Sequence, residues 1–284
     1  MTRTRLAVVG ILAVLATVLG LTAPLFANGA DPSANPSAKD KIEADPPPTL
    51  FPATRTHRVD SLIVPQTGRA HRLMAAYWAT AGRARDDAGF VAWVEKHFPG
   101  PPTTTARRRE MAEVERLDKG RTDSGVKAAD WLEAHGKKDV WKLYAHDQRE
   151  LLTKTAGGRR KDDVKAMLKM SKTIADTLGT HFHQSSPYVM DPKLRPDKNV
   201  RRGQVCPCSY PSRHASGSAA SRTYLGRLDP SRTAQYRETE DEVDYSRLYM
   251  AGHVASDLSG GALLGDMIGE YFLVTRQHVD PAQA

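Results

Sequence analysis

A short segment near the C-terminus combines an imidazole, a carboxylate and a guanidinium group. His253 and Asp257 are four residues apart, so on a helix they share a face, and the carboxylate can hold the imidazole in one tautomer. This spacing predicts that His253 acts as a directed base or nucleophile. Arg247 precedes the pair and offers a guanidinium that can grip two oxygens of a tetrahedral anion.

A second segment favours the binding of an anion. Ser212 follows Pro211 and is a natural N-cap, so the first N–H groups of the next helix would face whatever lies before them. Helix N-termini bind anions for this reason, and His214 would place a proton donor beside the anion. Lys193 and Arg195 add two cations in the preceding loop.

The histidines and cysteines outside these two segments do not have the spacing of a metal site. His181 and His183 have no carboxylate or cysteine nearby at ligand spacing. Cys206 and Cys208 are separated by one residue and cannot complete a structural zinc site unaided. They form either a small disulfide or two free thiols.

Apolar residues recur at helical spacing through most of the chain, so helices are expected to position these residues. No alternating strand pattern of any length occurs, so the predicted class is all-α. The stretch 179–210 is rich in proline, which predicts a long loop. Apolar spacing predicts helices around 73–78, 90–98, 111–117, 126–134, 140–152, 162–178, from 211 onwards, 231–250 and 254–274.

The first residues have the pattern of a targeting signal. Arg3 and Arg5 give a basic start and 6–21 is almost wholly apolar, so we interpret 1–27 as a signal peptide, with Ala30 as the alternative cleavage site. The competing interpretation is a retained membrane anchor, for which the apolar run is short. The signal implies a secreted, periplasmic or cell-surface protein.

The rest of the chain divides by composition into two parts. Residues 28–55 are rich in proline, alanine, serine and aspartate, which predicts a linker or a loosely docked arm. Residues 56–284 are expected to form a single all-α domain. No later stretch is apolar for long enough to predict a transmembrane region after removal of the signal.

Composition and charge narrow the class of partner. Of 284 residues 40% are hydrophobic, which excludes disordered and fibrous classes. Lys and Arg number 41 against 33 Asp and Glu, a formal charge of +8 that favours anionic partners. No long Lys/Arg tract occurs, so nucleic acid is not an expected partner, whereas a small phosphorylated substrate fits.

The order of these segments resembles the signature of the type-2 phosphatidic acid phosphatase superfamily over 188–272. That signature is a Lys separated by six residues from Arg-Pro, then Pro-Ser-Gly-His, then Ser-Arg-x5-His-x3-Asp. Arg213 stands where the family usually has Gly, and Tyr188 stands at the Lys position. The matching residues are Arg195, Pro196, Pro211, Ser212, His214, Ser246, Arg247, His253 and Asp257.

The chain looks most like the secreted class A non-specific acid phosphatases, and the resemblance implies a helical bundle that works through a phosphohistidine. His253 would be the nucleophile, Asp257 its orienting group and His214 the general acid. The phosphate would be held by Arg195, Arg247, Ser212 and the backbone N–H of Arg213, without metal or cofactor. Lys193 or the Arg213 side chain would replace the charge missing at Tyr188.

Two other functions are compatible with the same residues. Vanadium haloperoxidases share this architecture, and in such an enzyme vanadate would be a cofactor at the phosphate ligands, whereas in a phosphatase it would be an inhibitor. The chain could also be a catalytically weak protein that binds anions or surfaces on the same scaffold.

Overall fold

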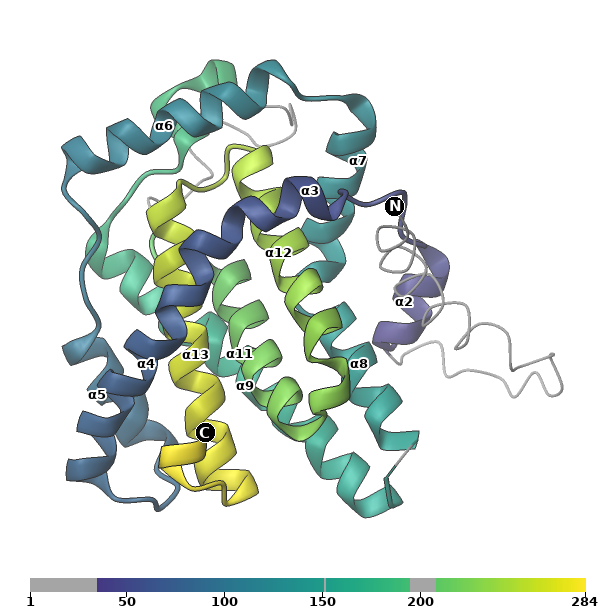
Figure 1. Ribbon diagram of the computed structural model, residues 1–284, viewed down its shortest axis with the longest axis vertical. Helices are drawn as coiled ribbons and strands as arrows, with labels where there is room; N and C mark the ends of the chain where they lie inside the picture. The colour runs from purple at the N-terminus through teal and green to yellow at the C-terminus, as the bar shows by residue number, and fades with distance from the viewer. Residues whose placement is uncertain (1–34, 151, 195–207) are drawn as a thin grey trace, which may run out of the picture.

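The computed structural model describes residues 35–150, 152–194 and 208–284 (Figure 1). Within these ranges every regular element is helical and no strand occurs, which confirms the predicted all-α class. The predicted signal and Arg195 lie outside the described residues. The longer helices are α4 (Asp60–Ala81), α5 (Asp87–His97), α6 (Thr104–Lys119), α7 (Asp123–Trp131), α8 (Asp139–Glu150), α9 (Lys154–Phe182), α11 (Arg213–Leu228), α12 (Thr233–Tyr249) and α13 (Ala255–Gln277).

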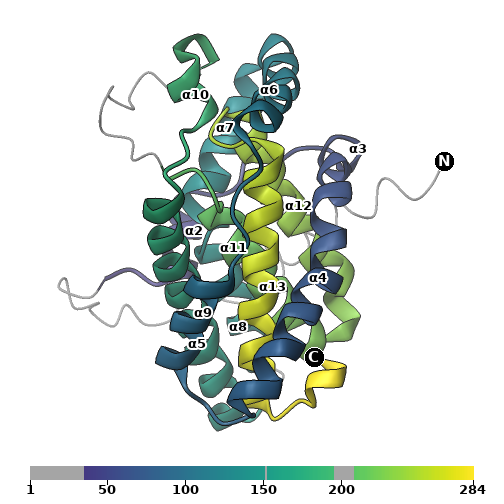
Figure 2. The same ribbon diagram turned by 90° about the vertical axis from the view of Figure 1, so that its left-hand side faces the viewer.

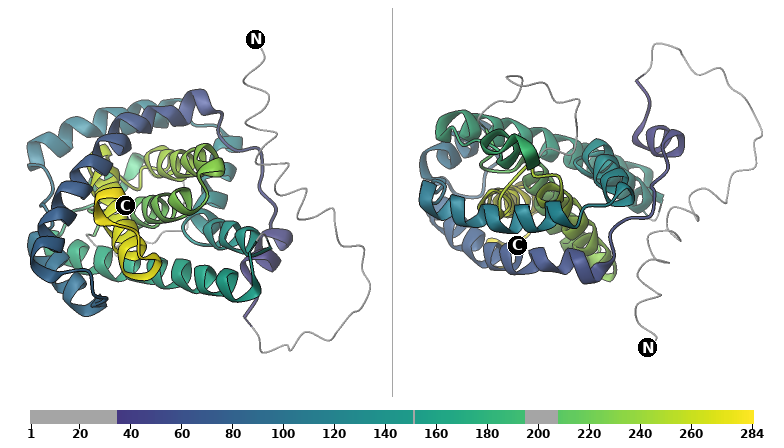
Figure 3. Two further views of the ribbon diagram at one scale, coloured as in Figure 1. Left: turned by 60° about the horizontal axis from the view of Figure 1, so that its bottom comes forward. Right: turned by 90° about the horizontal axis from the view of Figure 1, so that it is seen from above.

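Helix α13 is the centre of the bundle. Almost all of its side chains between Ser256 and Thr275 are buried, as expected for a helix that is apolar or small-sided all round. Helices α4, α9 and α11 pack against it, and α12 packs against α11 (Figures 1 and 3). On its lower half the Tyr271 ring stacks on Phe90, with ring centroids 4.1 Å apart.

Two glycines allow α11 to approach α13 closely. A Cβ atom at Gly261 would lie 2.6 Å from the carbonyl oxygen of Ser212, and one at Gly265 would lie 2.3 Å from that of Ser216. Real Cβ atoms do not make such short contacts, so any larger residue would push the helices apart. The glycines therefore set the distance between the starts of α11 and α13.

The helix predictions from apolar spacing are confirmed, with differences at the ends. The patterns over 90–98 and 111–117 fall in α5 and α6, and α9 extends beyond 162–178 in both directions. The predicted loop over 179–210 contains the short helix α10 (Pro187–Met190) and a 3₁₀ turn, η3 (Pro192–Leu194). Within it Cys208 is disulfide-bonded, and Cys206 lies outside the described residues.

The described part of the predicted linker or arm, 35–55, is packed on the bundle. It carries α2 (Ala38–Ala44) and leads into α3 (Ala53–Thr56), and it buries Ile42 and Phe51. The Phe51 ring meets that of Tyr245 edge-on at 4.9 Å. Composition alone does not reveal these anchors, because two apolar residues in a polar stretch carry no periodic signal.

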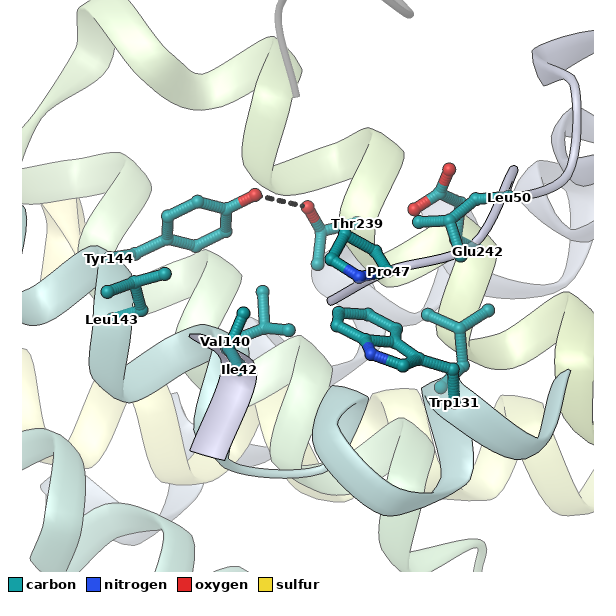
Figure 4. A pocket seen from close by; sticks show the side chains of 10 residues that line it. Ile42, Pro47, Leu50, Trp131, Val140, Leu143, Tyr144, Thr239 and Glu242 are labelled. Atoms are coloured by element: carbon teal, nitrogen blue, oxygen red, sulfur yellow. Dashed lines mark hydrogen bonds between the residues drawn. The ribbon is translucent and has the colours of Figure 1, made fainter. Parts of the chain in front are cut away.

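The arm closes an apolar pocket on one side of the bundle. Figure 4 shows Ile42 and Pro47 facing Trp131 and Tyr144, whose hydroxyl hydrogen-bonds that of Thr239 at 3.0 Å. The cavity holds about 20 Å³, about the space of one water. The arm thus covers this pocket opposite side chains of α8 and α12.

None of the described helices is both long enough and apolar enough to cross a membrane.

Candidate functional site

Three helix ends meet at one end of the bundle and carry the predicted chemistry. The starts of α11 and α13 and the end of α12 lie there, and α6 crosses over them (Figures 1 and 2). The backbone N–H of Ser212, just before α11, donates to the carbonyl of Asp257 in the first turn of α13 at 2.9 Å. This bond brings two of the predicted segments, far apart in sequence, into contact.

His253 and Asp257 are paired, but not on one helix face as their spacing predicts. Helix α12 ends at Tyr249 and α13 begins at Ala255, so His253 lies in the turn between them. The N–H groups of Gly252 and His253 both donate to the carbonyl of Arg247, at 3.0 and 3.3 Å, and close the turn. His253 is therefore presented from a tight backbone turn, with its Nδ1 atom 3.5 Å from Asp257 Oδ2.

Asp257 is fully buried and is the polar centre of the site. Its Oδ2 accepts from the N–H of Val254 at 3.1 Å, the reciprocal bond expected of an acidic residue in the first turn of a helix. Burial alone would raise the pKa of Asp257, but the hydrogen bonds and charges of His253 and Arg107 hold it below its usual value. The carboxylate therefore remains charged and available to orient the imidazole.

Two residues that sequence reasoning missed complete this centre. The buried guanidinium of Arg107, from α6, contacts both oxygens of Asp257, through Nη1 and, at 3.4 Å, through Nη2. The hydroxyl of Ser209 lies between the pair, 3.2 Å from His253 Nδ1 and 2.5 Å from Asp257 Oδ2. A signal existed for Arg107: it precedes Met111 by one helical turn, which places an arginine on the apolar face of its helix.

His214 is buried next to the start of α11. Ser212 is the N-cap of this helix, as predicted, and its Oγ accepts from the N–H of Ala215 at 3.4 Å. The Nε2 atom of His214 is buried and has no hydrogen-bond partner among the described residues. Burial, followed by the charges of Arg247, Lys137 and His253, lowers the pKa of His214 well below its usual value. His214 is thus uncharged in the free protein near neutral pH and lies within electrostatic reach of His253.

Arg247 is buried at the end of α12 and already holds a carboxylate. Its Nη1 donates to Glu133 Oε2 at 2.8 Å, and its Nη2 donates to the carbonyl of Ala129 at 3.3 Å. Burial would raise the pKa of Glu133, but Arg247, Lys137 and His253 lower it. The guanidinium of Arg247 thus already has an anionic partner in Glu133.

The two residues expected to replace the missing lysine are both exposed. Arg213 is exposed, and its Nη1 donates to Asp176 on α9 at 3.0 Å. Lys193 is exposed in η3. Tyr188 packs on a small apolar cluster around Val114 and Val254. Lys137, which no motif indicated, acts with Arg247 on both His214 and Glu133, and the charge of Arg213 also acts on His214.

A basic groove of about 740 Å³ adjoins this end of α11. It shares Lys137 and Arg213 with the surroundings of His214, and among the described residues that line it Asp162 is the one acidic side chain. Its other cationic side chains come from α8, α9 and the turn before α8: Lys138, Lys142, Lys165, Lys169 and Lys172. The groove therefore offers a positive potential beside the candidate site.

No protein-family model and no curated protein matches the chain.

Proposed function

We propose that the protein is an exported, metal-independent acid phosphatase that hydrolyses small phosphomonoesters through a phosphohistidine on His253. The observation that carries the proposal is the state of this imidazole. Its Nδ1 is engaged by Ser209 and Asp257, so Nε2 is left to attack. The basic groove supports an anionic substrate, and the apolar leader in the sequence supports export.

The geometry supports a two-step reaction. In the first step, His253 Nε2 attacks phosphorus, the bond from phosphorus to the ester oxygen breaks, and His214 gives a proton to the leaving oxygen. In the second, water attacks the phosphorus of phosphohistidine, its proton passes to His214, and inorganic phosphate leaves as His253 is regenerated. Arg247 and the first N–H groups of α11 hold the phosphate oxygens.

The first test is hydrolysis of a chromogenic phosphomonoester at acid pH, well below the melting temperature. We expect turnover that survives EDTA, because an imidazole is the nucleophile and guanidinium groups supply the positive charge. Orthovanadate should inhibit, because it reproduces the pentacoordinate phosphoryl state.

The other outcomes separate the alternatives. Activity lost with EDTA and restored by zinc or magnesium would contradict the mechanism. Peroxide-dependent halide oxidation after loading with vanadate would favour a haloperoxidase, and phosphate binding without turnover would favour an anion-binding protein.

A second prediction concerns the proton donor. We expect His214→Ala to reduce hydrolysis of an alkyl phosphate by at least ~10²-fold, the scale of losing a positioned general acid. Hydrolysis of a nitrophenyl phosphate should fall by less, because nitrophenolate leaves without a proton. The exposed His181, replaced by Ala, is the matched control. Equal losses on both substrates would remove His214 from this role.

His214 should also determine how the rate of hydrolysis depends on pH. The pKa of free His214 is lowered, so kcat/KM for the alkyl phosphate should fall as the pH rises through a value below the usual histidine range. Bound phosphate favours the charged form of His214. The fall of kcat with rising pH should therefore occur at a higher pH than the fall of kcat/KM. The mechanism pairs a charged His214 with a neutral His253, so we expect a bell-shaped curve whose two apparent values belong to the coupled pair.

A third prediction tests which cation replaces the missing lysine. We expect Lys137→Ala to lower kcat/KM by roughly tenfold, less than a fully buried contact because the side chain is exposed. Lys193→Ala is the control and should be nearly neutral, since its amine is solvated. Should both be neutral while Tyr188→Lys raises activity strongly, no cation has replaced the missing charge.

A further inference from the structure

A cluster of ligand-type side chains lies apart from the candidate phosphatase site. His57 belongs to the 3₁₀ turn η1 (His57–Val59), Asp60 begins α4, and Asp241 lies on α12. One ligand atom from each of the three lies within 4.8 Å of the other two. The cluster thus joins the N-terminal part of the described chain to α12.

Asp241 is the unusual member of this cluster. Asp241 is 1% exposed, and apart from the carboxyl group of Asp60 no group in the described part of the chain pairs with its oxygens. The carboxyl group of Asp60 lies against it. The nearby Arg237 compensates only in part, because its charge acts on Asp241 but its Nη1 donates to Glu240 at 3.1 Å.

Two carboxylates in contact, one of them buried without a donor, require a positive partner. Either a proton shared between them or a cation could provide it. A shared proton needs two oxygens and gives no role to His57, whereas a cation uses all three side chains. Ligands at 2.0–2.2 Å from one ion are about 3–4.4 Å apart, and the three ligand atoms here lie within 4.8 Å of one another.

We propose that His57, Asp60 and Asp241 bind a divalent cation of the zinc class. One imidazole and two carboxylates suit zinc and its neighbours in the first transition series, whereas calcium and magnesium prefer oxygen ligands alone. Three protein ligands leave coordination positions for water, and the exposed His57 provides the route of entry.

The bound cation has a structural role and takes no part in the proposed phosphatase reaction. It fastens the start of α4, and with it α3 and the N-terminal arm, to α12, the helix that carries Arg247 in its last turn. The site stands independently of the proposed phosphatase activity, which uses other residues.

The test is zinc binding by the full chain, followed by calorimetry and thermal melting after EDTA treatment. We expect the chain to bind one zinc ion at this site more tightly than any of its other histidines binds zinc. We also expect the Tm to rise by several degrees at saturating zinc. Asp241→Asn should abolish both effects. Asp244→Asn is the matched control, because Asp244 is equally buried and equally without donors but lies outside the cluster. It should keep both effects.

A second variant protects the test against misfolding. His57 is exposed, so His57→Ala should fold and yet bind zinc at least tenfold more weakly. A wild-type chain that binds no zinc, or zinc binding unchanged in both His57→Ala and Asp241→Asn, would overturn the proposal. A Tm raised by Asp241→Asn without any effect of zinc would identify a shared proton instead.

Discussion

Phosphomonoester hydrolysis is expected to fall by at least ~10⁴-fold when His253 is replaced by Ala, the scale on which removal of a nucleophile acts. No other group could then form the covalent intermediate, so the residual rate would come from phosphate binding alone. The measurement is kcat for a chromogenic substrate, with His181→Ala as a control that removes an exposed histidine elsewhere.

The same variant provides a direct assay of the intermediate. A phosphorus–nitrogen bond is labile in acid and stable in alkali, so wild-type protein quenched during turnover with labelled substrate should retain label only under alkaline conditions. His253→Ala should retain none. Label that persists in the variant, or that survives acid, would place the covalent bond on another residue and refute the phosphohistidine.

The largest effect on stability is expected from Arg107→Ala. This change leaves the carboxylate of Asp257 buried without its main cation, and breaking a buried pair typically costs about 3–5 kcal/mol. Ser209 and the N–H of Val254 still contact Asp257, so we expect the lower end of that range in chemical denaturation. Arg108→Ala, an exposed neighbour on the same helix, should change the free energy of unfolding little.

The pH dependence distinguishes this ion pair from simple packing. The lowered pKa of Asp257 contributes stability that is present above its unfolded pKa and lost as the pH falls through the folded value. Without Arg107 the folded pKa rises, so the loss should begin at higher pH. Arg107→Lys should restore part of the stability, and kcat should fall more than KM rises, because Arg107 positions the imidazole through Asp257. An unchanged pH profile in Arg107→Ala would reduce its role to packing.

Helix positions were predictable because apolar spacing repeats along the chain, as in α5, α6 and α9. The link between the segments around Ser212 and Asp257 could be predicted only from the resemblance, since no local rule says which helix ends meet. The placement of His253 was wrong in detail because Ala251 and Gly252 stop α12 from continuing. Ala251 adopts φ 55°, a left-handed conformation that ends a helix, and its residue type gives no sign of this.

The missed residues depend on tertiary contacts. Arg107 could have been found from its place on the apolar face of α6, but three successive arginines resemble a solvated surface. Ser209 and Glu133 carry no motif, because each gains its role only from a partner about 45 or more positions away in sequence. Lys137 likewise acts through space on His214.

The carboxylate of Glu133 on Arg247 has a consequence for the timing of the proposed cycle. In this cycle the substrate phosphate would have to displace the carboxylate of Glu133 from Arg247. Each binding event would therefore exchange one anionic partner of Arg247 for another. In the proposed cycle the tethered carboxylate would return to Arg247 as inorganic phosphate departs, and this competition would shorten the residence of the product. We therefore expect free phosphate to inhibit weakly, so that turnover would continue where the product accumulates.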